Sequence, residues 1–305
     1  MRLLLTAALL FALSTPALAQ DAPEPSPHAQ AQNRTPLPKV IPGPATEEIT
    51  VTSNRLRSII RTFVDTATAP SPIGQVSRWK VRLCPRTTGM GPGFTTFVTK
   101  RVREIATDLG VPVNPDENCS PNLQIIFTEH PQAMLDIIRT KLPALLGYHY
   151  AAQAKELSTV EHPIQGWYAT GSRDRMGQLV PDNPYGVSTM TVEGSRIKTG
   201  LRSEFVAVTV VVDLITVENQ EIGAIADHIA LLAFSQSKAF ERCRTVPSIA
   251  NMLLNCDASL KAVALTRFDR AYLKALYAMT DRDTPGHLQK GDIAYLMREY
   301  LARED

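Results

Sequence analysis

The chain has 305 residues, of which 32 are Lys or Arg and 30 are Asp or Glu, so its formal net charge is +2. This balance provides neither the basic surface of a general nucleic-acid-binding protein nor a polybasic segment that binds an anionic membrane. Hydrophobic residues make up 44% of the chain, which is ordinary for a globular protein, and the length allows one large domain or two small ones.

Residues 1–19 have the three parts of a secretory signal peptide. Arg2 gives a positive start, residues 3–13 are almost entirely apolar, and Ala17 and Ala19 form the small-x-small pattern of a cleavage site. The apolar run is shorter than the roughly 20 residues that span a bilayer as a helix, and no later stretch is apolar for long enough. The sequence therefore predicts cleavage after Ala19 and a mature chain that is periplasmic or secreted.

The segment after the cleavage site, residues 20–46, is rich in Pro, Ala and Gln and has almost no large apolar residue. This composition predicts a disordered linker. The folded part is expected to be a single domain over residues 47–305. A short strand at residues 49–52 and a helix capped by Asn54 are predicted at its start.

The rest of the chain alternates between extended and helical patterns. Strands are predicted at residues 79–84, 122–127, 166–170 and 205–215. Helices are predicted at residues 94–109, 131–142, 221–234, 265–279 and 291–301. The strand at 205–215 is β-branched throughout, as expected of a central strand, and residues 171–195 are expected to form a long surface loop. This order predicts an α+β domain with a single mixed sheet.

The four cysteines are Cys84, Cys119, Cys243 and Cys256. An even number in an exported chain predicts disulfides, and four cysteines allow three connectivities. We favour Cys84–Cys119 and Cys243–Cys256, because each pair is local and lies between elements that are expected to pack together. The sequence has no Cys-x-x-Cys, so it gives no support to a thioredoxin-like redox pair or a cysteine zinc knuckle.

The C-terminal half contains three segments that carry a resemblance. Residues 265–277 (LTRFDRAYLKALY) have Leu-Thr-x-x-Asp and end in Leu-Tyr, residues 247–252 read PSIANM, and the helix at 222–236 precedes both. In this order they resemble the closing helix, the methionine turn and the zinc-binding helix of metzincin-type zinc proteases. Residues 75–280 look like an uncharacterised bacterial exported family, domain of unknown function 2927, which is related to the zincins. The resemblance implies a zincin-like fold.

The zinc motif of those proteases is missing from this chain. A zincin has His-Glu-x-x-His, because histidines at positions i and i+4 share a helix face and the Glu activates a zinc-bound water. Here Asp227 and His228 stand in the place of His-Glu, and Leu231 stands in the place of the second His. Counting from His228 places Leu232 at i+4, and the next histidine is His287. The sequence therefore predicts no metal, no cofactor and a non-catalytic protein.

A hydrolase with a non-standard site is the first alternative. Glu129 and His130 follow a predicted strand end, where sites of α/β sheets often lie. Together with Asp227 and His228 they are weak catalytic candidates, and this hypothesis requires all four side chains to line one cleft. Asp269, in the first turn of its helix, is expected to stabilise the helix N-terminus instead.

A cell-envelope binding module is the second alternative. It would act on an envelope protein or peptide through an exposed aromatic patch formed by Tyr148, Tyr150, Trp167 and Tyr168. The chain contains neither the Gly-x-Ser-x-Gly motif of serine hydrolases nor a phosphate-binding glycine loop, so neither motif supports an enzymatic class.

Overall fold

The computed structural model describes residues 53–182, 192–195, 198–237, 242–280 and 283–303. The predicted signal peptide at 1–19, the linker at 20–46 and the strand at 49–52 lie outside these residues. Thr50–Asp305 form one compact unit. Within its described residues, no helix is both long enough and apolar enough to cross a membrane.

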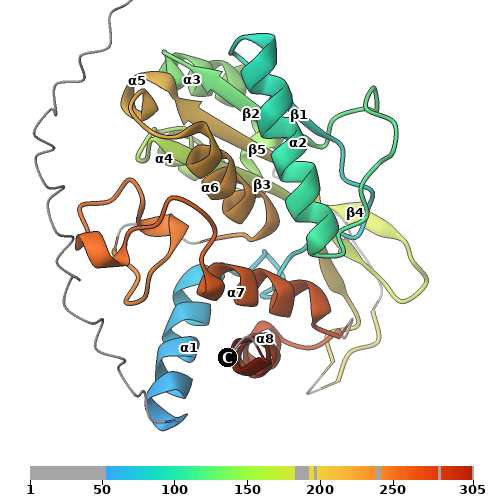
Figure 1. The fold of residues 1–305 in the computed structure, drawn as a ribbon. Coiled ribbons are helices and arrows are strands. Elements are labelled where there is room, and N and C mark those ends of the chain that lie inside the picture. The colour runs from blue at the N-terminus through green and yellow to red at the C-terminus, as the bar shows by residue number, and fades with distance from the viewer. Residues whose placement is uncertain (1–52, 183–191, 196–197, 238–241, 281–282, 304–305) are drawn as a thin grey trace, which may run out of the picture. The chain divides into compact units, whose positions relative to one another are not determined.

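A five-stranded mixed sheet forms the centre of this unit, with the strand order β1-β2-β5-β3-β4 (Figure 1). The strands are β1 (Pro85–Thr88), β2 (Leu123–Thr128), β3 (Ile164–Arg173), β4 (Leu179–Pro181) and β5 (Arg202–Asp213). β1, β2 and β5 are parallel, whereas β3 runs antiparallel to both β5 and β4. The predicted α+β class and the central position of the long β-branched strand are thus confirmed.

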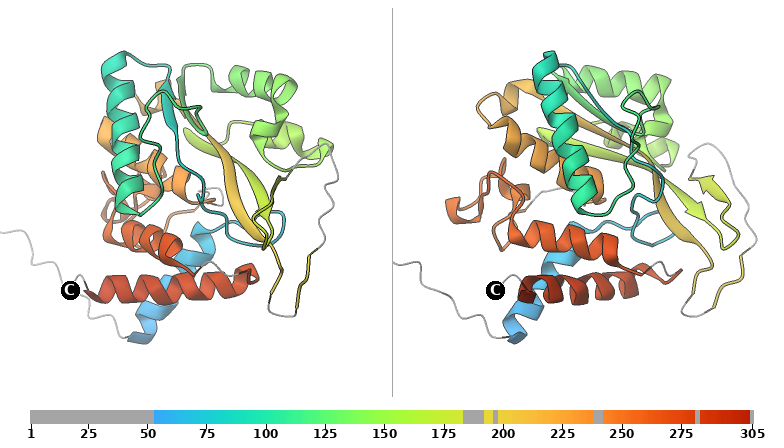
Figure 2. Two further views of the ribbon diagram at one scale, coloured as in Figure 1. Left: turned by 90° about the vertical axis from the view of Figure 1, so that its right-hand side faces the viewer. Right: turned by 45° about the vertical axis from the view of Figure 1, so that its right-hand side comes forward.

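Helices cover both faces of the sheet. Val210 and Val212 of β5 belong to the main core, whereas Val211 packs with Trp167 and with helix α3 (Pro131–Lys141) on the opposite face. This division follows from the alternation of side chains along a strand. Helix α6 (Ile222–Phe234) packs beside α2 (Pro92–Asp108) on the main-core face (Figures 1 and 2).

A further helical layer lies beyond α6. Helix α7 (Arg267–Ala278) packs along α8 (Gly286–Arg303), and α8 also contacts α1 (Ser53–Ala67) (Figure 1). Two further α-helical segments are short, namely α4 (Ala154–Leu157) and α5 (Leu214–Val217). The C-terminal helices are therefore integral parts of the same core as the sheet.

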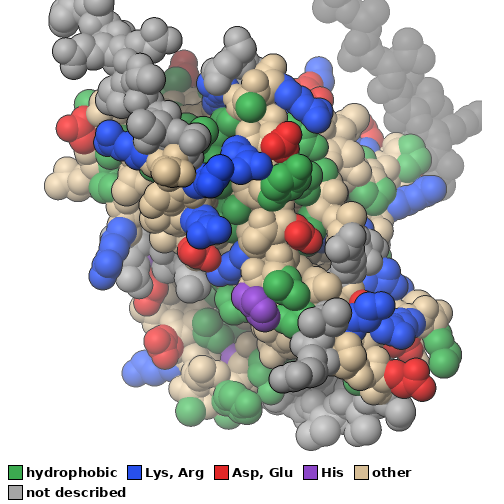
Figure 3. Space-filling model, turned by 90° about the horizontal axis from the view of Figure 1, so that it is seen from below, with side chains coloured by type: hydrophobic (Ala, Val, Ile, Leu, Met, Phe, Trp, Pro, Cys, Tyr) green, Lys and Arg blue, Asp and Glu red, His purple; other side chains and the backbone are tan. Residues whose placement is uncertain are grey.

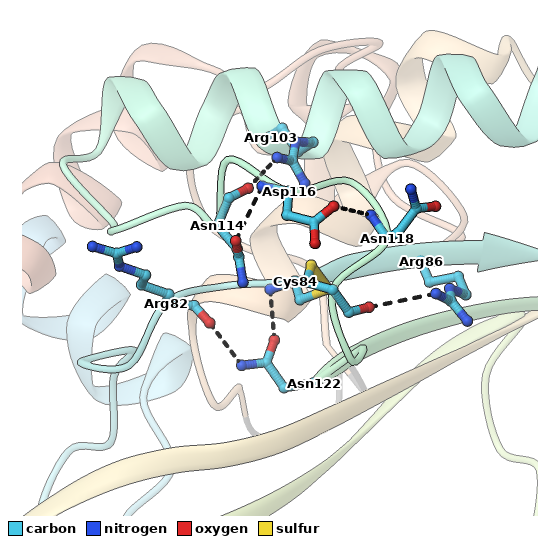
Figure 4. Close-up of a disulfide and its surroundings, with 9 residues drawn as sticks. Arg82, Cys84, Arg86, Arg103, Asn114, Asp116, Asn118 and Asn122 are labelled. Atoms are coloured by element: carbon cyan, nitrogen blue, oxygen red, sulfur yellow. Dashed lines mark hydrogen bonds between the residues drawn. A yellow bond between two sulfur atoms is a disulfide. The ribbon is translucent and has the colours of Figure 1, made fainter.

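Both disulfides join segments that are close along the chain. Cys84 pairs with Cys119 and Cys243 pairs with Cys256, the two local pairs that we favoured from the sequence. Near the first of these, Asn122 accepts a hydrogen bond from the Cys84 amide at 2.7 Å and donates to the Arg82 carbonyl at 3.0 Å (Figure 4). The two disulfides are consistent with an exported protein.

Two predictions of local structure were wrong. The alternation at residues 79–84 reflects the burial of Trp79 and Leu83, yet within this segment only Leu83 forms a single bridge, and the strand begins at Pro85. The segment predicted as a long loop at 171–195 contains the end of β3 and the edge strand β4, and its residues 183–191 lie outside the described residues. Its polar residues read as a loop, but an edge strand tolerates them because one side of it faces solvent.

Candidate functional site

Helix α6 is buried along nearly its whole length. Every residue from Ala224 to Phe234 is buried, because α2, the sheet and α7 surround the helix. Its apolar sequence suits this position. Its two polar residues, Asp227 and His228, are therefore enclosed in the core as well.

Asp227 is part of a bidentate ion pair. The Arg101 guanidinium of α2 donates from Nε to Oδ1 at 2.7 Å and from Nη2 to Oδ2 at 3.1 Å. The backbone amide of Leu265 donates to Oδ2 at 2.8 Å. The hydrogen bond to Asp227 also raises the pKa of Arg101. Both carboxylate oxygens thus join α6 to α2 and to the segment that leads into α7.

His228 is a buried neutral imidazole at neutral pH. Its side chain is only 3% exposed, and burial lowers its pKa to about 4, with a smaller contribution from the nearby His162. His228 and Asp227 are adjacent on a helix, so they point in directions about 100° apart and do not face each other.

Asp269 has a larger structural function than its first-turn position predicted. Its carboxylate accepts hydrogen bonds from the Ser248 hydroxyl at 2.6 Å, from the Ile249 amide at 2.9 Å, and from the amide and hydroxyl of Thr266, each at 2.9 Å. Burial raises the pKa of Asp269, and these hydrogen bonds oppose that shift. The capping box with Thr266 thus begins α7 and also anchors the turn at Ser248 and Ile249.

The other pair of catalytic candidates lies in a different environment. Glu129 and His130 are exposed at the end of β2, just before α3. Because Asp227 and His228 are buried, the four side chains do not share an open cleft. Among the described residues there is also no group of three or more His, Cys, Asp or Glu that could hold a metal ion.

A cavity of about 290 Å³ lies between β3, the segment that precedes it, and the end of α6. Its lining residues are Gln153, Glu156, Leu157, Glu161, His162, Ile164, Gln165, Gly166, Trp167, Tyr168, Leu232 and Ser237. The carboxyl groups of Glu156 and Glu161 are on exposed residues, and the lining contains no Lys or Arg. Nε2 of His162 is buried and has no hydrogen-bond partner among the described residues. The cavity therefore favours a ligand with positive charge or hydrogen-bond donors.

Gly166 presents its backbone at this cavity. The Val208 amide donates to the carbonyl of Asn122, the residue just before β2, so Val208 and Val210 direct their backbone groups toward β2 and away from β3. Gly166 lies opposite Val210 and therefore directs its N–H and C=O outward. β4 pairs only with Gly171–Arg173 of β3, so it does not reach Gly166. No described residue forms a hydrogen bond with the backbone of Gly166 from this outer side.

The four aromatic residues proposed as one exposed patch are divided by the sheet. Tyr148 and Tyr150 are 40% and 67% exposed, with ring centroids 5.8 Å apart. Trp167 is buried beside α3, whereas Tyr168 packs against the other face and donates to the Leu232 carbonyl at 3.0 Å. Consecutive residues of a strand point to opposite faces, which is why this prediction was wrong for Trp167 and Tyr168.

The sequence did not single out this cavity. Glu161 and His162 read as a turn before β3, and the segment at 147–165 has no clear periodicity. The outward amide of Gly166 depends on strand pairing, which one sequence does not reveal. Comparisons with protein-family models, curated proteins and solved structures found no match.

Replacing Asp227 tests whether its ion pair is structural. D227A removes the acceptor of the Arg101 guanidinium and the Leu265 amide, so we expect it to lower the free energy of unfolding by about 3 kcal/mol in urea denaturation. The control is E104A, because Glu104 is a second partner of Arg101 but is 50% exposed and 3.9 Å away. E104A should cost less than about 1 kcal/mol. Equal losses in the two variants would contradict this assignment.

The depressed pKa of His228 makes stability depend on pH. The unfolded imidazole takes up a proton near pH 6.5, whereas the folded one does so only near pH 4. His228 therefore contributes stability above pH 6.5 that is lost as the pH falls, by roughly 2 to 3 kcal/mol between pH 7 and pH 4.5. Urea denaturation across this range should show a smaller loss in H228Q. H130Q, which removes an exposed imidazole, should retain the wild-type dependence of the free energy of unfolding on pH. If H228Q showed the same dependence on pH as the wild-type protein, the assignment would be refuted.

Proposed function

We propose that the chain is an exported protein that acts by binding rather than by catalysis, on a zincin-like scaffold. The order of its elements supports this proposal. The resemblance to metzincins implies a certain order of elements, and the chain has it: the strand β5 is followed by the helix α6, the turn at Ser248 and Ile249, and the helix α7. The hydrogen bonds of Asp269 join the turn to α7.

The residues of α6 do not fit a zinc site. A catalytic zinc needs three protein ligands and an open position for water. Asp227 is already bound to Arg101 and to the Leu265 amide, and Leu231 and Leu232 hold the two possible i+4 positions. This helix therefore offers zinc at most the single imidazole of His228, so no hydrolytic step is derived through a metal. The burial of Asp227 and His228 also disfavours the hydrolase that would combine them with Glu129 and His130.

Export is supported by two independent features. Both disulfides require an oxidising environment to persist, as in the periplasm or outside the cell. Residues 1–19 have the pattern of a signal peptide, and residues 20–46 have the composition of a linker. In this proposal the periplasm is the compartment in which the domain meets its partner.

The ligand that best fits the cavity beside β3 is a short extended peptide with a basic side chain. The outward N–H and C=O of Gly166 can pair with the backbone of an extended segment, as in the addition of a strand to a sheet. Glu156 and Glu161 line the same cavity, which contains no Lys or Arg to neutralise them. This combination of an unpaired strand position with two carboxylates carries the proposal.

A peptide titration tests this function. The probe is acetyl-Ala-Ala-Lys-Ala-Ala-amide, and the same peptide with Glu in the centre is the control ligand. We expect the Lys peptide to shift the Gly166 amide resonance in a saturable way, since the amide gains a hydrogen bond and the Lys side chain meets the carboxylates. The Glu peptide should produce a much smaller shift because Glu156 and Glu161 repel it.

Variants separate this site from general electrostatic attraction. E156Q/E161Q should remove the preference for Lys over Glu. E117Q/E218Q removes two exposed carboxylates outside the cavity and should keep that preference. Equal shifts with both peptides in the wild-type protein, or no shift at Gly166, would overturn the proposed function.

A further inference from the structure

A second cavity, of about 410 Å³, lies between α1 and α8. Its lining includes four cationic side chains, Arg57, Arg61, Lys290 and Arg298, together with His287. Asp65 is the one acidic residue of this lining. Figure 3 views this end of the domain and shows Lys and Arg side chains on it, interspersed with acidic and apolar ones. The cavity is thus strongly positive although the chain as a whole is nearly neutral.

Two of these cations have no ion-pair partner among the described residues. Lys290 lies 3.8 Å from Asp65, and Arg298 lies 3.5 Å from Glu299. Arg57 and Arg61 are one turn apart on α1, and neither forms an ion pair with a described residue. Uncompensated guanidinium groups at a concave surface attract anions, and their planar fork matches the oxygens of a phosphate group.

The base of the cavity is apolar. Ile60 and Val64 of α1 are buried beneath it, and Ala294 of α8 lies opposite. The Tyr295 ring is largely exposed, with the Arg298 guanidinium 5.3 Å from its centroid. A ligand that combines an anionic group with an apolar or planar portion therefore fits this lining better than a bare inorganic ion does.

Gly291 is part of the lining of the cavity. It lies within the 18-residue helix α8, where glycine is unfavourable because it loses more conformational entropy on folding than other residues do. A Cβ atom added at Gly291 would meet no neighbouring atom within 4 Å, so close packing does not explain the glycine. Its lack of a side chain does leave space at the lining of the cavity.

We propose that the cavity between α1 and α8 binds a ligand bearing a phosphate group, held by Arg57, Arg61 and Arg298 above an apolar base. The phosphate can belong to a soluble phosphate ester or to the headgroup of an anionic lipid, since both present the same oxygens to the arginines. This site is separate from the cavity beside β3 and does not depend on the function proposed there.

Two probes distinguish the sources of the phosphate group. Phenyl phosphate is titrated while the amide resonances of Ala294 and Tyr295 are followed, with phenol as the uncharged control. In parallel, the protein is sedimented with vesicles of phosphatidylglycerol and phosphatidylcholine in equal parts, and with vesicles of phosphatidylcholine alone. Saturable shifts with phenyl phosphate but not with phenol, or binding to the anionic vesicles alone, support the site. Vesicle binding assigns the lipid source, and phenyl phosphate binding without it assigns the soluble ester.

Three variants decide whether binding occurs at this cavity. R57Q/R61Q should weaken binding about tenfold or more, since two charge-assisted contacts are lost. G291L should weaken it similarly by filling the cavity without changing any charge, and circular dichroism checks that each variant is folded. The matched control R55Q/K155Q removes two exposed cations outside the cavity and should retain binding within twofold. The proposal is overturned if neither probe binds, or if the control weakens binding as much as R57Q/R61Q does.

Discussion

Asp227 and Asp269 are buried carboxylates that connect segments far apart along the chain. Asp227 binds Arg101, which lies 126 residues earlier, and the amide of Leu265. Asp269 binds Ser248 and Ile249 and caps its own helix with Thr266. A buried carboxylate is costly unless its oxygens are hydrogen-bonded, and breaking such a group is strongly destabilising. The relative positions of α2, α6, α7 and the turn before α7 therefore depend on these two side chains.

This use of Asp227 bears directly on function. The position on α6 where a zincin would carry His-Glu holds an ion pair that maintains the core. His228 beside it is buried and neutral at neutral pH. Polar groups available to a ligand lie elsewhere, at the cavity beside β3 and at the basic cavity between α1 and α8. In the function that we propose, the domain binds its ligands at its periphery, around a helix that is part of the core.

The long elements could be predicted from the sequence because their runs of apolar and β-branched residues indicate which segments are buried. The β-branched run at 205–215 predicted the central strand β5, and the apolar run at 221–234 predicted the buried helix α6. The alternating pattern gave a wrong prediction where residues are buried without belonging to a strand. Trp79 and Leu83 are examples of such residues. The candidate sites depend on contacts between distant segments. Neither the partner of Asp227 nor the outward direction of the Gly166 backbone is encoded in a local pattern.

Metal content tests the central claim most directly. The full chain is expressed, the protein is purified without chelator, and its zinc is measured by elemental analysis. Because α6 offers zinc at most the imidazole of His228, we expect no stoichiometric zinc. Stoichiometric zinc that persists through dialysis would contradict the account. It would require ligands among Asp227, His228, His130 and His149, and the ion pair of Asp227 with Arg101 would have to open.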